Sequence, residues 1–204
     1  LSSLDKLERR LLRGLDENPL RNIAADELLS SLKRGGTHGL GDIEDIDEAF
    51  SDLAHEEAIS SETTDWRPFE THWSERLARQ LGTIGGGNHF AEISRVAEVN
   101  DKAEAKKAGL GVGQLVVLVH SGSRGVGHEL PARWGAQTLH GESLEQYLEE
   151  LAAARTFARA NRFVLAFQML RALGAARPSK VTLCCDVVHN DITRSELEGE
   201  EVWL

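Results

Sequence analysis

Three of the eight histidines stand where a strand end or a glycine loop would hold an imidazole in a fixed direction. His89 follows a glycine-rich stretch, His120 ends the apolar run 115–119, and His189 ends a second apolar run. Imidazole is the commonest nitrogen ligand of divalent transition metals, and three converging imidazoles would leave positions open for water or substrate. The sequence contains no His-x-x-x-His or Cys-x-x-Cys pair, so hydrogen-bonded structural histidines are the alternative interpretation.

The turn after His120 could hold a phosphate group. It reads Ser-Gly-Ser-Arg-Gly over residues 121–125. Backbone N–H groups of glycine turns form anion-binding nests, serine hydroxyls add donors, and arginine supplies a planar fork. The alternative is an ordinary strand-to-helix turn with a solvated Arg124. The glycines of residues 82–87 fit neither the P-loop nor the dinucleotide-binding pattern, so neither standard nucleotide-binding fold is indicated.

Apolar runs and helical periodicity predict an α+β fold, with buried strands that carry the metal site and helices packed around them. The apolar run within Gln114–His120 is typical of a buried strand, and the two cysteines are expected in the core. Strands are predicted over 88–93, 114–120, 181–188 and 201–204, and helices over 4–15, 25–34, part of 45–60, 70–80, 125–139 and 143–173. Gly174 is placed to end the last helix, and Ser143 with Gln146 fits a capping box at its start.

The composition excludes several classes of protein. The 204 residues, 41% of them hydrophobic, suit one globular domain or one domain with an appendage. No apolar run approaches the roughly 20 residues of a membrane helix, so no membrane partner is expected. The adjacent Cys184 and Cys185 do not suggest a disulfide framework, which makes a cytoplasmic location the expectation. The net charge of −10 lies mostly in residues 1–80, whereas residues 120–180 hold 5 acidic and 8 basic side chains.

Taken together, the motifs resemble those of the RtcB family of RNA-splicing ligases. The resemblance rests on Leu-Gly-Thr-Ile-Gly-Gly-Gly-Asn-His-Phe-Ala-Glu at 81–92, His-Ser-Gly-Ser-Arg-Gly at 120–125 and His-Asn at 189–190, with a weaker match in Ala-Asn-Arg at 160–162. It implies that residues 81–204 are the metal- and GTP-binding central part of a ligase domain. Residues 1–80 would be an acidic helical segment of the same catalytic domain.

The resemblance also implies a reaction. Members of this family join an RNA 3′-phosphate or 2′,3′-cyclic phosphate to a 5′-hydroxyl, with GTP and two Mn²⁺ ions, through a guanylylated histidine. His89 would bind one manganese ion, and His120 and His189 the other. Asn88 and Arg124 would act in catalysis, with Arg124 on an RNA or nucleotide phosphate. The GTP site would be formed by Asn88, His89, Phe90, Ala91, Glu92, His189 and Asn190.

Parts of the family pattern are not found in this sequence. Residues 1–80 hold no Asp-x-x-Cys motif, and the His-Gly-Ala-Gly-Arg motif of the guanylylated histidine does not occur. We therefore expect the 204 residues to be an internal fragment of a longer ligase, inactive by itself. Two other functions stay open: a metal-dependent phosphoesterase with the same three histidines, and a non-catalytic module that binds RNA ends.

Overall fold

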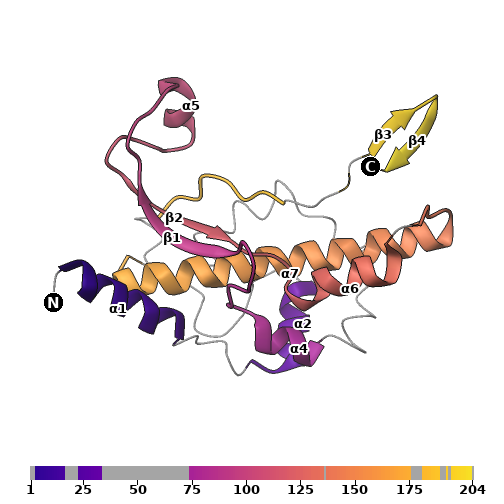
Figure 1. The fold of residues 1–204 in the computed structure, drawn as a ribbon, viewed down its shortest axis with the longest axis horizontal. Helices are drawn as coiled ribbons and strands as arrows, with labels where there is room; N and C mark the ends of the chain where they lie inside the picture. Colours follow the sequence, from indigo (N-terminus) through magenta and orange to yellow (C-terminus); the bar gives the residue numbers. More distant parts are fainter. Residues whose placement is uncertain are drawn as a thin grey trace.

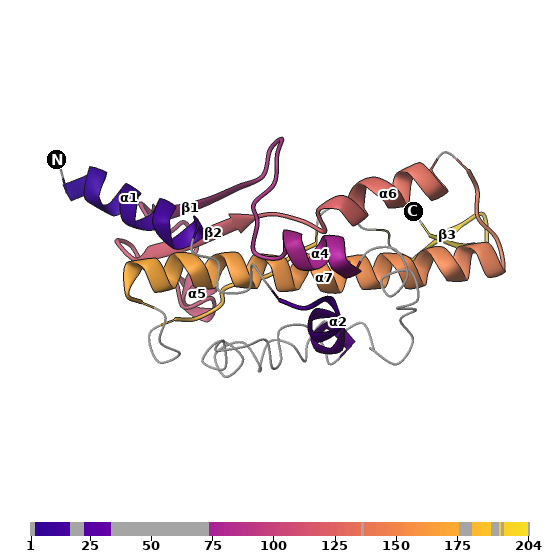
Figure 2. The same ribbon diagram turned by 90° about the horizontal axis from the view of Figure 1, so that it is seen from below.

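One long helix, α7 (Glu142–Leu173), forms the axis of the molecule. The computed structural model describes residues 3–16, 23–33, 74–135, 137–175, 181–188, 192 and 194–203. Within this part, α7 extends over 32 residues and most other elements lie along it (Figures 1 and 2). Its sequence is rich in Ala, Leu, Glu and Arg, which favour helix, and it contains neither Gly nor Pro.

Both ends of α7 have identifiable causes. Gly174 adopts a left-handed φ of 73° and its N–H donates to the Arg171 carbonyl, so the predicted helix end is confirmed. The predicted capping box is wrong. The helix begins one residue earlier than expected, which places Ser143 inside the first turn, and its hydroxyl donates back to the His140 carbonyl at 2.8 Å. The Gln146 amide donates to the Glu142 carboxylate instead.

The hydrophobic core lies where three shorter helices meet α7. These helices are α2 (Ala25–Lys33), α4 (Ser74–Gln80) and α6 (Gly125–Trp134). They bury Leu28, Leu77, Leu81, Val126 and Leu130 against Phe157 and its neighbours on α7. Each fully buried Leu or Phe side chain contributes about 1.5–3 kcal/mol relative to an exposed one. The remaining helix, α1 (Ser3–Asp16), packs on the C-terminal end of α7 (Figure 1).

The predicted helices are confirmed where the structure describes them, with a shorter bound in one case. Of the helix expected over 70–80, the described residues 74–80 are helical, and the one expected within 45–60 lies outside the described residues. Helix α6 ends at Trp134 rather than at residue 139. Gly135 there takes an extended conformation while its N–H still donates to the Pro131 carbonyl.

The first two strands form an antiparallel hairpin, β1 (Phe90–Arg95) with β2 (Leu115–His120). Phe90 pairs with His120 and Arg95 with Leu115. The connection contains the short helix α5 (Lys102–Lys107), capped by the Asp101 carboxylate. The prediction of a buried strand is wrong, because Leu115 is 66% and Leu118 46% exposed. Helix α7 packs against β2, but Leu115 and Leu118 point to opposite faces of a sheet that has two strands in the described part of the chain, and neither is fully covered.

The segment 181–188 differs from its prediction. It is extended but pairs with no strand among the described residues, and both cysteines are exposed rather than in the core. Partial desolvation and the neighbouring Cys185 thiol raise the pKa of the Cys184 thiol. The segment is attached to α7 by an ion pair of Asp186 instead. Because it is a single extended chain at the surface, its apolar side chains need not be buried on both sides.

A second hairpin follows, formed by β3 (Arg194–Leu197) and β4 (Glu200–Trp203), so the strand expected at 201–204 is confirmed. Glu198 and Gly199 both have positive φ, as a two-residue hairpin turn requires. The mixture of helices and hairpins confirms the α+β class. Among the described helices, none has the length and apolar character needed to cross a bilayer.

Candidate functional site

The glycine-rich loop between α4 and β1 brings two predicted site residues together. Gly85 has a φ of 107°, a conformation that L side chains rarely adopt. A Cβ atom there would collide with Nη1 of Arg124 and lie 2.7 Å from Nδ1 of His89. The absence of a side chain at Gly85 therefore allows both His89 and Arg124 to lie against the same piece of backbone.

The two imidazoles of the described site lie close to each other. His89 lies in the loop just before β1, and His120 is the last residue of β2. Their ring centroids are 5.6 Å apart with an interplanar angle of 68°, and the Phe90 ring lies 5.4 Å from that of His120. The convergence of two of the three predicted ligands follows from the pairing of β1 with β2.

The described donor set suits a divalent metal in kind. His89 and His120 supply two nitrogen donors of the type that such ions bind. No three His, Cys, Asp or Glu side chains within the described ranges group closely enough to hold a metal ion by themselves. The third predicted ligand, His189, and its neighbour Asn190 lie outside the described residues.

Arg124 is held in an unusual backbone conformation at the start of α6. Its φ of 56° and ψ of −130° fall in a region that costs a non-glycine residue about 1–3 kcal/mol, and such residues cluster at functional sites. Its Nε donates to Thr83 Oγ1 at 3.0 Å, which links the 121–125 turn to the glycine loop. Burial lowers the pKa of Arg124, although guanidinium groups keep their charge in proteins. A positive charge therefore lies next to the two imidazoles.

A cavity of about 1570 Å³ collects four of the predicted site residues: Asn88, His89, His120 and Arg124. This volume exceeds the roughly 300–1,000 Å³ of pockets for drug-sized ligands. Sequence reasoning missed the remainder of the lining, which includes His128, His140, Arg155 and the two tryptophans Trp134 and Trp203. Nothing in their spacing signals a shared cavity, because α6, α7 and the last hairpin meet only in the folded chain.

Three residues predicted for the nucleotide site do not line this cavity. Phe90, Ala91 and Glu92 belong to β1, and Phe90 and Glu92 are exposed. The Glu92 carboxylate accepts a hydrogen bond from Ser94 Oγ at 3.0 Å.

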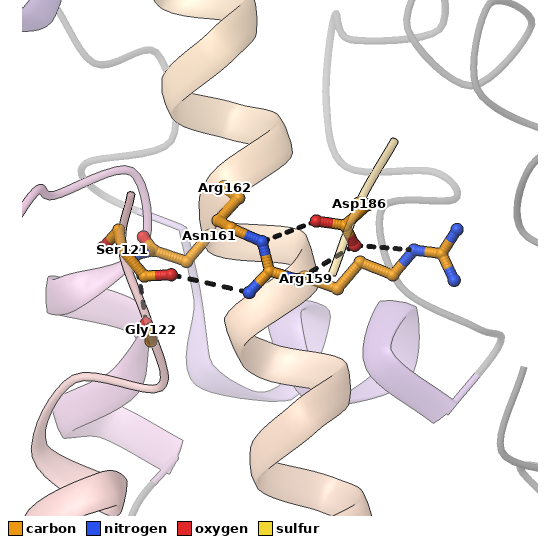
Figure 3. A network of polar contacts seen from close by, with 6 residues as sticks. All are labelled: Ser121, Gly122, Arg159, Asn161, Arg162 and Asp186. Atoms are coloured by element: carbon orange, nitrogen blue, oxygen red, sulfur yellow. Dashed lines mark hydrogen bonds and ion pairs between the residues drawn. The ribbon is translucent and has the colours of Figure 1, made fainter. Parts of the chain in front are cut away.

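A buried polar pair on α7 was also missed as part of the site (Figure 3). Asn161, which is fully buried, hydrogen-bonds to both loops of the site. Arg162 forms a two-bond ion pair with Asp186, at 2.6 Å from Nε and 2.9 Å from Nη2. The sequence signal was present in Ala-Asn-Arg at 160–162, two polar residues in an Ala- and Phe-rich stretch, but the partners of a helical residue are not visible in sequence.

This is an α+β protein whose cavity gathers His89 and His120 with Asn88 and the partly buried Arg124, the kinds of group that bind phosphates and divalent metals. The family model described as "tRNA-splicing ligase RtcB" matches residues 3–204. The chain belongs to the RtcB family.

Individual relatives agree with this assignment. The chain is 27% identical over 217 residues to the RNA-splicing ligase RtcB of Mycobacterium tuberculosis, covering 92% of this chain and 48% of that protein. It is 31% identical over 179 residues to the tRNA-splicing ligase RtcB of Thermococcus kodakarensis, covering 74% of this chain and 37% of the relative. With that of Methanopyrus kandleri the identity is 29% over 250 residues, 98% of this chain and 25% of the relative. The chain thus spans between a quarter and a half of the length of these relatives.

Proposed function

We propose that the protein is an RNA ligase that joins a 3′-phosphate or 2′,3′-cyclic phosphate end to a 5′-hydroxyl end, with GTP and Mn²⁺. The reaction would proceed through a guanylylated histidine that is none of the residues assigned here. Residues 81–204 would be the metal- and GTP-binding part. Membership of the RtcB family and relatives named as RNA-splicing and tRNA-splicing ligases support this proposal.

One observation carries the proposal beyond family membership. Asn88 and His89 come from one segment of the sequence and His120 and Arg124 from another, yet all four line one cavity. A planar guanidinium can bind a phosphate through two parallel hydrogen bonds, and imidazoles bind divalent metals. The cavity therefore offers both an anion-binding and a metal-binding group, which phosphoryl transfer uses together.

The residues have distinct roles in this proposal. His89 would hold one manganese ion, and His120 and His189 the other. Bound manganese supplies positive charge and Lewis acidity at phosphate oxygens. Asn88 and Arg124 would bind and orient phosphates, and the GTP site would extend over Asn88–Glu92, His189 and Asn190. Glu92 would read a guanine edge with its carboxylate, which can accept further hydrogen bonds beside the one from Ser94 to its Oε1.

The decisive experiment incubates the full-length protein with GTP labelled at the α-phosphate and with Mn²⁺. Covalent labelling of the protein, together with joining of RNA that carries 3′-phosphate and 5′-hydroxyl ends, is expected. Release of phosphate from the RNA without any protein labelling would identify a phosphoesterase instead. Binding of 3′-phosphate RNA with neither labelling nor turnover would identify a non-catalytic RNA-end-binding module.

The metal assignment makes a separate prediction. Replacing His120 with alanine in the full-length protein should remove one Mn²⁺ per chain, because it deletes one of the two nitrogen donors proposed for that ion. Elemental analysis after equilibrium dialysis measures the stoichiometry. His140→Ala is the matched control, since this exposed histidine is not assigned to a metal. Unchanged manganese content in the His120 variant would reject the assignment.

A further inference from the structure

Asn161 joins two loops that come from distant parts of the chain. Its Oδ1 accepts hydrogen bonds from the backbone N–H of Gly82 at 2.7 Å and of Thr83 at 3.2 Å. Its Nδ2 donates to the Thr83 carbonyl at 3.1 Å, to Ser121 Oγ at 3.0 Å and to the Gly122 carbonyl at 3.3 Å. One side chain thus supplies both the acceptor and the donor that these loops require.

The two loops carry the groups that define the cavity. The first runs through Thr83 into Gly85, against which His89 and Arg124 lie, and Thr83 Oγ1 accepts from Arg124. The second begins immediately after His120 and leads to Arg124. Ser121 Oγ also donates to the Ile84 carbonyl at 2.7 Å, so the loops contact each other directly beside Asn161. A shift of either loop relative to the other would therefore move Arg124 or His120 away from His89.

The next residue of α7 fixes the same region from the other side. Arg162 reaches the Ser121 carbonyl with Nη1 at 3.5 Å and binds Asp186 with its other nitrogens (Figure 3). Arg159, one turn earlier, adds an ion pair to Asp186 at 3.7 Å. Because these side chains project from the middle of a 32-residue helix, the loops are attached to a rigid element.

We infer that Asn161 is a positioning residue of the site: its amide sets the arrangement of loops 82–84 and 121–122, and through them of Arg124 and His120 relative to His89. An amide is required rather than a carboxylate, because an ionised carboxylate only accepts hydrogen bonds and would face two carbonyl oxygens. The geometric part of the inference is independent of the reaction. Its effect on ligation rests on the function proposed above.

The test compares two amide-to-acid changes on one helix. Asn161→Asp is made in the full-length protein, with Gln168→Glu as the control. Gln168 is a buried amide on α7, 1% exposed, whose side chain makes no hydrogen bond within the described part of the chain. Its replacement therefore also buries a carboxylic acid but breaks no hydrogen bond to either loop. Hydrogen exchange should become faster in loops 82–84 and 121–124 in the Asn161 variant, by roughly tenfold, and stay within about twofold in the control.

Steady-state kinetics then separate positioning from general stability. Below the melting temperature of each variant, kcat for RNA joining should fall about 10- to 100-fold in Asn161→Asp while KM for GTP changes less than about threefold, as a misplacement near 1 Å would cause. Gln168→Glu should leave both constants within about twofold. Ser121→Ala removes the hydrogen bonds of the Ser121 hydroxyl to Asn161 and to the Ile84 carbonyl but leaves the other Asn161 hydrogen bonds in place. It should show the same pattern with a smaller loss, and it decides the question if Asn161→Asp does not fold.

Equal exchange and equal kcat losses in the Asn161 and Gln168 variants, or an unaltered kcat in Asn161→Asp and Ser121→Ala, would overturn the inference. A failure of the proposed function is recognised separately, because the unsubstituted protein would then join no RNA. In that case the hydrogen-exchange comparison alone supports or rejects the positioning role.

Discussion

At the scale of single residues, the approach of His89 to Arg124 depends on the lack of a side chain at Gly85. Three consecutive glycines, 85 to 87, allow the cost of a left-handed backbone to be separated from the cost of a steric collision. Gly85 has a left-handed φ and two neighbouring side chains within its Cβ space, whereas Gly87 has a left-handed φ and open space. Gly86 has open space and no left-handed φ. The series therefore distinguishes backbone strain from collision.

Gly85→Ala should destabilise the fold and lower RNA joining at least tenfold, because the new methyl group displaces Arg124 and His89 from each other. Gly87→Ala should cost about 1–2 kcal/mol from left-handed strain alone, with activity less affected. Gly86→Ala should change neither the stability nor the activity, because a Cβ atom there has open space. Denaturant unfolding and single-turnover joining measure the two effects, and equal activity in all three variants would contradict this account of Gly85.

The sequence was sufficient to find those site residues whose side-chain direction is restricted by their immediate neighbours in the chain. Asn88 and His89 follow the glycines, and His120 and Arg124 follow the end of a strand, so local pattern places each of them. Asn161 was visible in the sequence only as part of a weaker motif match, and its role was found in the structure. Its role depends on partners 39 to 79 positions away in sequence, and no spacing rule relates a helical asparagine to two remote loops.

At the scale of elements, the helices and the hairpin strands were predictable, but strand burial and the state of the segment 181–188 were not. Helical periodicity and a glycine stop are local features, so α7 and its end were predicted to within a residue. A run such as Val181–Val188 indicates only that a segment is largely apolar. Whether it becomes a buried strand depends on a neighbouring strand, and here Asp186 attaches it to α7 by an ion pair instead.

The attachment through Asp186 can be measured against an exposed pair. Asp186→Asn should lower the free energy of unfolding by about 3 kcal/mol, because it leaves the largely buried Arg162 and Arg159 without their shared carboxylate. Glu104→Gln removes the same charge from the exposed pair with Lys107 and should cost less than about 1 kcal/mol. Denaturant unfolding of both variants gives the comparison; equal costs would show that Asp186 does not anchor the segment.

At the scale of the whole molecule, the negative charge is concentrated in residues 1–80, but the packing of the helices does not separate these residues from the remainder. The sequence carries a net charge of −10, yet Arg124 and Arg155 line the cavity, so a polyanion would meet local positive charge. Helix α7 contacts elements from both the acidic first 80 residues and the remainder. It packs against α1 and α2 as well as α6 and β2 (Figure 2). Elements from both parts of the chain therefore pack on the helix that carries Asn161.

Helix α1 lies close to α7 at Gly14, where a Cβ atom would collide with Cβ of Ala172. In a helix interior, Gly→Ala normally stabilises by about 0.5–1 kcal/mol. Here we expect the opposite sign. Gly14→Ala should destabilise by about 1–3 kcal/mol, because the added methyl group overpacks the crossing and separates the helices. Denaturant unfolding of the full-length protein measures the change.

A double variant identifies the cause. Adding Ala172→Gly to Gly14→Ala moves the methyl group from α7 to α1. It thereby removes the Cβ atom with which the new methyl group at residue 14 would collide. The two changes should then couple favourably, by about 0.5–3 kcal/mol relative to the sum of the single effects. Additive effects, or a Gly14→Ala variant more stable than the parent, would show that α1 does not pack on α7 at this crossing. Favourable coupling would instead show that the first helix of the acidic segment is part of the same folded unit as the helix that carries Asn161.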